Sequence, residues 1–270
     1  MKKKGVAILI IGGVTLITLI VTVTGYLVSQ RLAVDRYVFS DKLNLKICHI
    51  SDLHIPNLGV SDEKILTEVK NADVDLIVLT GDIIDGRANS DDLKTLDSFL
   101  LRLRAVAPVY GVIGNHEIGS ELYDDYLSVC ADNGVEILLN ESALVKINSA
   151  KLFVTGLTDG NLFSEKNLPS FERERLAAKA DVSVLLAHRP ELVESYLDGD
   201  FDVIFAGHAH GGQARIFNRG MYAPNQGLFP RYTSGEYSFG DTKMYVSRGL
   251  GDGNNKFRYL NPYNIIIVDL

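Results

Sequence analysis

The chain has 270 residues, of which 46% are hydrophobic and 23% are charged, a composition typical of a folded domain with a buried core and unlike that of a disordered or fibrous protein. Its formal net charge is −7, and because the first 31 residues carry four basic side chains and no acidic one, the rest holds 23 basic against 34 acidic side chains, a net of −11. Such a surface repels polyphosphate, so we expect no nucleic-acid partner.

The first predicted element is a membrane-spanning helix. Residues 5–29 contain no charged side chain, and 25 residues in a helix can cross about 30 Å of hydrocarbon with some tilt. The alternative is a cleaved signal peptide, whose apolar core would be shorter, about 7 to 15 residues, and would end at a small-x-small site. We therefore expect an anchor at residues 1–30. Three lysines precede the span and one arginine follows it, which predicts a single-pass protein of the cell membrane with a cytoplasmic N-terminus and its main domain on the outer side.

The next part of the chain predicts a sheet covered by helices. We expect a linker at residues 31–45 and one domain at residues 46–270. Apolar runs bounded by polar residues predict strands at residues 45–50, 75–80 and 108–113. Capped or amphipathic segments predict helices at residues 61–72, 91–106 and 120–134. Alternation of strands and helices is typical of βαβ units.

The later part of the chain predicts a second sheet of mixed or antiparallel order. Residues 143–157 have the pattern of a hairpin. Further strands are predicted at residues 181–188, 202–208, 237–240, 243–249 and 264–270. Residues 215–240 are rich in loops.

Polar clusters follow five of the predicted strands at the point where each strand ends. They are "CHISDLH" with Asp52 and His54, "VLTGDIID" with Asp82 and Asp85, "GVIGNHE" with Asn115 and His116, "LLAHRP" with His188, and "FAGHAH" with His208 and His210. Ligand and catalytic residues of open α/β sheets gather at the carboxyl ends of strands. A lone histidine is more often satisfied by a backbone carbonyl, and we assign that structural role to His49, which lies inside the first strand.

Five such clusters together indicate a metal centre, because buried carboxylates and imidazoles need a compensating charge. Imidazole nitrogens, carboxylates and one amide oxygen, without a thiolate, suit first-row divalent ions such as Mn, Fe, Co or Zn. In an extended segment alternate side chains point the same way, so His208 and His210 can serve two different ions. The candidate ligands are too many for one ion and fit two ions that share a carboxylate: Asp52, His54, Asp82, Asn115, His188, His208 and His210.

These motifs, in this order, resemble the calcineurin-like metallophosphoesterase superfamily. "SDLH", "GDIID", "GNHE", "AHRPE" and "GHAHGGQ" match its five sequence blocks without a missing ligand, from Lys46 to about Gly212. The last block and a late "VSRGLG" resemble the membrane-associated branch that includes bacterial cell-envelope phosphodiesterases and UDP-diacylglucosamine pyrophosphatases. The chain departs from that branch at "NPYN", where proline followed by glutamate is expected.

The resemblance implies an α/β fold, the four-layer αββα sandwich, with the site at the strand ends. His116 would act on the substrate and would not bind metal, and Asp85 would orient His116. The implied ligands are Asp52, His54 and His210 for a first metal, Asn115, His188 and His208 for a second, and Asp82 as the bridge between them.

Arginine side chains are candidates for contacts with a substrate phosphate, which their planar guanidinium groups bind in a bidentate manner. Arg189 directly follows a predicted ligand, and Arg231, Arg248 and Arg258 lie in the glycine-rich later loops. For each of them the alternative is an ordinary solvated surface arginine. We select Arg189 and Arg231 as substrate-binding candidates.

These features predict a membrane-anchored phosphoesterase with two divalent metal ions, Mn, Fe or Zn, of which Mn is expected to support activity in vitro. A metal-bridging hydroxide would attack a phosphodiester or pyrophosphate, and His116 would protonate or stabilise the leaving oxygen. The anchor would keep the site near cell-envelope or lipid-linked substrates. The alternatives are a phosphomonoesterase or protein phosphatase with the same metal centre, and a non-catalytic metal-binding scaffold, which would be expected to have lost ligands.

Overall fold

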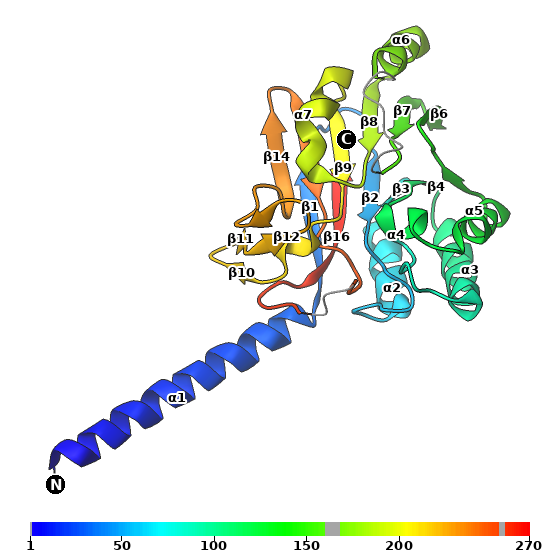
Figure 1. Ribbon diagram of the computed structural model, residues 1–270. Helices are drawn as coiled ribbons and strands as arrows, with labels where there is room; N and C mark the ends of the chain where they lie inside the picture. Colours follow the sequence, from blue (N-terminus) through cyan, green and yellow to red (C-terminus); the bar gives the residue numbers. More distant parts are fainter. Residues whose placement is uncertain (1, 160–167, 254–256) are drawn as a thin grey trace.

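Two stacked sheets form the centre of the protein. A computed structural model describes residues 2–159, 168–253 and 257–270. In it, two six-stranded sheets lie face to face, helices cover their outer faces, and one long helix extends away from them (Figure 1).

The first sheet contains the predicted βαβ units. Its strand order is β1-β16-β2-β3-β4-β5, in which β2 to β5 are parallel and β16 pairs with β2 in antiparallel fashion. Its strands are β1 (Leu32–Val38), β2 (Lys46–Ile50), β3 (Leu76–Thr80), β4 (Val109–Val112), β5 (Val135–Ile137) and β16 (Tyr263–Asp269). The parallel strands are connected through α2 (Asp62–Ala72), α3 (Ser90–Arg104), the short α4 (Asn115–Ile118) and α5 (Tyr123–Asp132).

The second sheet has the predicted mixed order. Its strands follow the order β14-β15-β9-β8-β7-β6, with β15, β9, β8 and β7 parallel and an antiparallel strand at each edge. They are β6 (Glu141–Ile147), β7 (Ala150–Gly156), β8 (Val182–Leu186), β9 (Val203–Ala206), β14 (Gly235–Phe239) and β15 (Thr242–Val246). Its outer face carries α6 (Leu168–Ala178) and α7 (Val193–Tyr196).

Apolar packing explains this layering. The central strands β3 and β8 are buried at every position, so they lack the alternation of a half-exposed strand. Side chains such as Leu76 and Val184 pack between the two sheets. Helices α2, α3 and α5 cover the outer face of the first sheet, and Phe171 of α6 and Val193 of α7 pack on that of the second. The predicted four-layer αββα sandwich is confirmed.

The segment expected to be a linker is in part a strand. Residues 32–38 form β1, which pairs in parallel with β16 at the edge of the first sheet. Asp35 accepts a hydrogen bond from Nδ2 of Asn264 (2.8 Å), and Nη2 of Arg248 lies 3.0 Å from the same carboxylate. The prediction of a linker over residues 31–45 is therefore wrong for residues 32–38. Their strand depends on partners 231 residues away in sequence, as in the pairing of Leu32 with Tyr263, which no local pattern reveals.

Helix α1 (Lys2–Ser29) extends away from the sheets (Figure 1). Its portion Ile8–Ser29 has a mean hydropathy of 2.4 and is, by length and composition, able to span a membrane. Near its C-terminal end, Oη of Tyr259 donates a hydrogen bond to the carbonyl of Val21 (3.0 Å), and the N–H of Leu260 donates one to the carbonyl of Gly25 (3.2 Å). The helix is thus attached to the domain and leads directly into β1.

Two small hairpins lie in the region predicted to be rich in loops. The first pairs β10 (Arg215–Ile216) with β11 (Arg219–Gly220), and the second pairs β12 (Tyr222–Ala223) with β13 (Gly227–Leu228). Both project beside the second sheet (Figure 1).

The role of β1 can be tested on one face of that strand. Val34 packs against the core under the first sheet, whereas Val38 is 61% exposed on the same face. We expect Val34→Lys to lower the free energy of unfolding by about 1–2 kcal/mol, since it loses apolar burial and desolvates a charge. Thermal unfolding of the detergent-solubilised chain measures this. Val38→Lys is the matched control, and an equal effect of both variants would contradict a packed β1.

Candidate metal centre

The five predicted clusters meet at one edge of the sandwich. Three of them follow β2, β3 and β4 of the first sheet, and two follow β8 and β9 of the second. Because these strands end at the same edge, their polar side chains converge between the two sheets. His49, by contrast, lies inside β2 with Nε2 at 2.7 Å from Oγ1 of Thr80, in agreement with a structural role.

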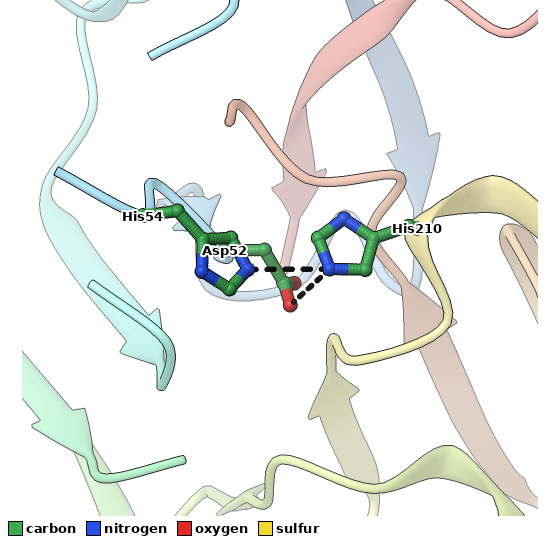
Figure 2. A group of neighbouring side chains, drawn as sticks. All are labelled: Asp52, His54 and His210. Carbon is green, nitrogen blue, oxygen red and sulfur yellow. Dashed lines mark hydrogen bonds and ion pairs between the residues drawn. The ribbon is translucent and has the colours of Figure 1, made fainter. Parts of the chain in front are cut away.

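One group of convergent side chains consists of Asp52, His54 and His210 (Figure 2). The Nε2 atoms of the two histidines lie 3.2 Å apart, and Nε2 of His210 is 3.6 Å from Oδ1 of Asp52. Burial lowers the pKa of His54 to about 4 and that of His210 well below its usual value, so both rings are neutral at pH 7. Two neutral rings and a carboxylate that share one point are the donor arrangement of a divalent cation.

A second group consists of Asp82, His188 and His208. Nε2 of His188 lies 3.1 Å from Nδ1 of His208 and 3.2 Å from Oδ2 of Asp82. Burial disfavours the charged form of His188, but the carboxylate of Asp82 outweighs this effect and raises the pKa of His188 to about 10. The pKa of Asp82 is shifted by the same interaction. Burial alone would raise it, but the charge of His188 overcomes this effect and lowers the pKa of Asp82 well below its usual value.

Asp82 stands between the two groups. Its Oδ2 atom, besides contacting His188, is 3.8 Å from Nε2 of His54. The buried Oδ1 atom of Asn115 has no hydrogen-bond donor among the described residues. In addition, burial raises the pKa of Asp52 to about 6, as expected for a carboxylate without a compensating cation. The orphaned oxygen, the buried carboxylates and the facing rings all fit a pair of divalent cations.

The backbone around these side chains is strained. Five of the seven predicted ligands have φ values between 46° and 63°, namely Asp52, His54, Asp82, His208 and His210. Residues other than glycine rarely adopt this left-handed conformation, and such strain collects at functional sites. The expectation of an extended segment at His208 and His210 is therefore wrong. The two histidines still join different groups.

His116 is oriented by a backbone group. Its Nδ1 atom accepts a hydrogen bond from the N–H of Gly86 (3.0 Å), which places the ring proton of the neutral form on Nε2. Asp85, predicted to orient His116, lies 3.8 Å away, too far for a hydrogen bond, and its Oδ1 atom binds Arg87 (3.0 Å). Gly86, the residue after Asp85 in the same loop, thus positions His116.

The structure separates the two arginine candidates. Arg189 binds the buried carboxylate of Asp159 with two nitrogens and lines a cavity of about 400 Å³, together with His116 and residues of both histidine groups. Arg231 is 74% exposed and lies outside that cavity, 3.9 Å from Glu194. Of the two candidates, Arg189 is therefore the one that lines the cavity of the metal centre.

Glu117 is a site residue that the sequence reasoning missed. Its buried carboxylate accepts hydrogen bonds from the backbone N–H groups of Asp82 (2.8 Å), Ile83 (2.6 Å), Ile84 (2.9 Å) and Gly114 (2.7 Å). It thereby joins the loops after β3 and β4. The only signal was the glutamate in "GNHE", directly after the predicted residues of that motif. Burial and the nearby Asp82 raise the pKa of Glu117 to about 7, although the backbone donors favour its charged form.

Known proteins are similar to this chain in sequence and in fold. A sequence model described as calcineurin-like phosphoesterase matches residues 45–212. The uncharacterized metallophosphoesterase YkoQ of Bacillus subtilis is 28% identical over 211 residues, covering 77% of this chain and 76% of the relative. Phosphodiesterase YaeI of Escherichia coli is 27% identical over 234 residues, covering 83% and 81%. Among solved structures, GAP50, the anchor in the inner membrane complex of Plasmodium, has a TM-score of 0.55 at 14% identity, covering 83% and 80%, a likeness of fold alone.

Metal uptake should release a proton from His188. Because its pKa is raised to about 10, His188 is protonated at neutral pH and must lose that proton before it can bind a metal ion. We expect about one proton released per metal pair, and an affinity that rises about tenfold per pH unit between about pH 7 and pH 9. Calorimetric titration of the metal-free chain in buffers of different ionisation enthalpy measures both quantities. An affinity that stays constant over this range would contradict the protonated state.

The hydrogen bonds to Glu117 predict that even a conservative substitution at this position lowers stability and metal affinity. In Glu117→Gln, one acceptor oxygen becomes an NH₂ group that faces two backbone N–H donors. The variant should lose about 1–3 kcal/mol of stability for the unsatisfied donors, together with metal affinity. Thermal unfolding and metal titration measure these losses. Glu121→Gln, at an exposed position in the following turn, is the matched control and should leave both unchanged.

Proposed function

Because the chain belongs to the calcineurin-like phosphoesterase family and is therefore a hydrolase acting on phosphoester bonds, we propose that it is a membrane-anchored phosphodiesterase or pyrophosphatase with a dinuclear metal centre. The observation that carries this proposal is the position of the Asp82 carboxylate, which lies within 4 Å of one histidine from each group. A carboxylate in that place can serve two cations at once.

The proposed ligands follow from the two groups. Because the donor set has no thiolate, Mn, Fe and Zn are the candidate metals, with Mn proposed to support activity in vitro. Two such ions would supply positive charge to the phosphate and lower the pKa of a water molecule that becomes the nucleophile. The residues that would hold the first ion are Asp52, His54 and His210, those that would hold the second are Asn115, His188 and His208, and Asp82 would serve both.

His116 is proposed to stabilise the leaving oxygen by a hydrogen bond from Nε2. The hydrogen bond from Gly86 leaves the ring proton on Nε2, and His116 lines the cavity that both metal groups also line. A hydrogen-bond donor to the charge that develops on a leaving oxygen contributes typically about 10²- to 10³-fold in rate. Arg189, held by Asp159, would bind a non-bridging phosphate oxygen and keep phosphorus in line with the nucleophile. Asp85 supports the loop that orients His116.

The space around His116 favours a substrate with two substituents on phosphorus. His116 and Asn115 line the cavity of about 400 Å³ and also a second one of about 300 Å³ beside Asp85 and Gly86. A phosphodiester or pyrophosphate could place one substituent in each cavity, whereas a monoester would fill only one. The name of the E. coli relative, a phosphodiesterase, supports the same assignment. A phosphomonoesterase or protein phosphatase is the second candidate.

Helix α1 supports the membrane part of the proposal. With its N-terminus in the cytoplasm, as the flanking lysines predict, the metal centre would face the outer side of the cell membrane. Because α1 leads into β1 without a free tether, the site would stay at a short distance from the bilayer. We infer that the substrate is a cell-envelope or lipid-linked phosphate ester, since such molecules are concentrated there.

The deciding assay compares bis(p-nitrophenyl) phosphate with p-nitrophenyl phosphate, using the full chain in detergent after chelation and return of Mn²⁺. We expect metal-dependent turnover with a preference for the diester. His116→Gln should lower kcat by about 10²- to 10³-fold at unchanged metal content, whereas Asp82→Asn should lose metal and activity together. A preference for the monoester would support the phosphatase alternative, and metal binding without turnover would support the scaffold.

A further inference from the structure

The small hairpins carry apolar side chains that the proposed chemistry does not use. Phe217 is 97% exposed, Leu228 73% and Phe229 72%, more than any other large hydrophobic side chain of the described residues outside α1. We refer to residues 214–231, which include both hairpins, as the hairpin face. Large exposed apolar groups gathered in one place mark contact with a partner or a membrane.

The backbone conformation of the hairpin face also indicates a functional surface. Phe217 and Asn218 form the tip of the β10–β11 hairpin with φ values of 49° and 64°, and Phe229 has a φ of 54°. Asparagine and glycine occupy such left-handed positions readily, but phenylalanine does so only at a cost. Within the described structure these exposed rings contribute little packing that would offset this cost. Backbone strain of this kind is concentrated at functional sites.

The charge of this region differs from that of the rest of the chain. Between Asp202 and Glu236 there is no carboxylate, whereas Arg215, Arg219 and Arg231 lie in the same stretch of a chain with a net charge of −7. Arg219 and Arg231 line a cavity of about 500 Å³ next to Phe229. Arginine beside exposed aromatic side chains is the combination that suits a surface of anionic phosphate headgroups over hydrocarbon.

The hairpin face is joined to α1 through one short segment. Tyr259 donates a hydrogen bond from Oη to the carbonyl of Val21, while its carbonyl accepts the N–H of Arg215 (2.9 Å) at the start of β10. Val21 lies eight residues before the end of the apolar span Ile8–Ser29, which corresponds to about 12 Å of helix. A side chain bound at that height lies within the outer leaflet once α1 spans the membrane, so the segment that carries it lies at or just below the bilayer surface. In Figure 1, β10 and β11 lie on the side from which α1 extends, and α6 lies at the opposite end.

We propose that the hairpin face rests on the phospholipid bilayer that holds α1, with Phe217, Leu228 and Phe229 in the apolar interface and Arg219 and Arg231 among anionic headgroups. This inference rests on the anchoring part of the proposed function. The membrane contact would also affect how a substrate reaches the metal centre, because Tyr222, Pro224 and Asn225 of the second hairpin line its cavity. The mouth of the site is then next to the lipid surface, and a lipid-linked phosphate reaches it without leaving the bilayer.

The chain contains no tryptophan, so a single introduced indole reports its own surroundings. The full chain is placed in nanodiscs that contain phosphatidylglycerol, with and without bromine on the acyl chains, which quenches indoles in the apolar region. Phe217→Trp and Phe229→Trp should lose most of their emission in brominated discs and emit at shorter wavelength. Leu176→Trp, on the exposed face of α6, is the matched control and should not be quenched. Tyr26→Trp, on α1 itself, reports the anchor.

The outcomes separate the inference from its premise. Quenching at positions 26, 217 and 229 but not at 176 supports the proposal. Quenching at 26 alone overturns it and leaves the anchor intact, and the absence of quenching at 26 overturns both the anchor and the membrane contact. A second measurement tests the headgroup contact: Arg219→Gln in the Phe217→Trp background should reduce quenching in phosphatidylglycerol discs more than in discs of uncharged phosphatidylcholine. An equal effect in both lipids would overturn the role of Arg219.

Discussion

The carboxylate of Asp82 connects the two halves of the sandwich. It follows β3 of the first sheet, contacts His188 after β8 of the second, and accepts the N–H of His116 after β4 (2.9 Å). Its own N–H is bound by the buried Glu117. Buried charges are tolerated only when they are paired and hydrogen-bonded, so the loops around Asp82 have little freedom. The geometry of the candidate centre is set by how this one charge is compensated.

The site is assembled mainly from backbone constraints. Asp52, Asp82 and His210 adopt left-handed conformations in the loops after their strands, and the carboxylate of Glu117 joins the loops after β3 and β4. Glycine is needed where these loops touch, since a Cβ atom at Gly114 would lie 2.3 Å from Oδ1 of Asp82. Local strain and close backbone approach are tolerated at functional sites because packing elsewhere holds them in place.

Most of the site could be predicted from the sequence, because its residues come directly after apolar strands and carry distinctive chemistry. Six of the seven candidate ligands lie in the two groups and Asn115 lines the cavity beside them, and the four-layer fold agrees with the alternation of strands and helices. Features that depend on distant partners could not be predicted. Strand β1 has no pattern of its own without β16, the exposure of Arg231 depends on loop packing, and Glu117 acts through backbone groups that leave no mark in the sequence. The prediction of an extended backbone at His208 and His210 was also wrong, because the motif "GHAH" does not reveal whether its backbone is extended or turned.

The position of β16 has a consequence for how the sheet is completed during synthesis. β16 lies between β1 and β2 and is the last of the described strands along the chain. Until it is made, β1 has no partner and β2 presents an open edge, although both strands have long left the ribosome. Late, non-local pairings of this kind slow folding and leave strand edges open to wrong partners. The nascent domain therefore depends on protection of these edges until β16 is translated.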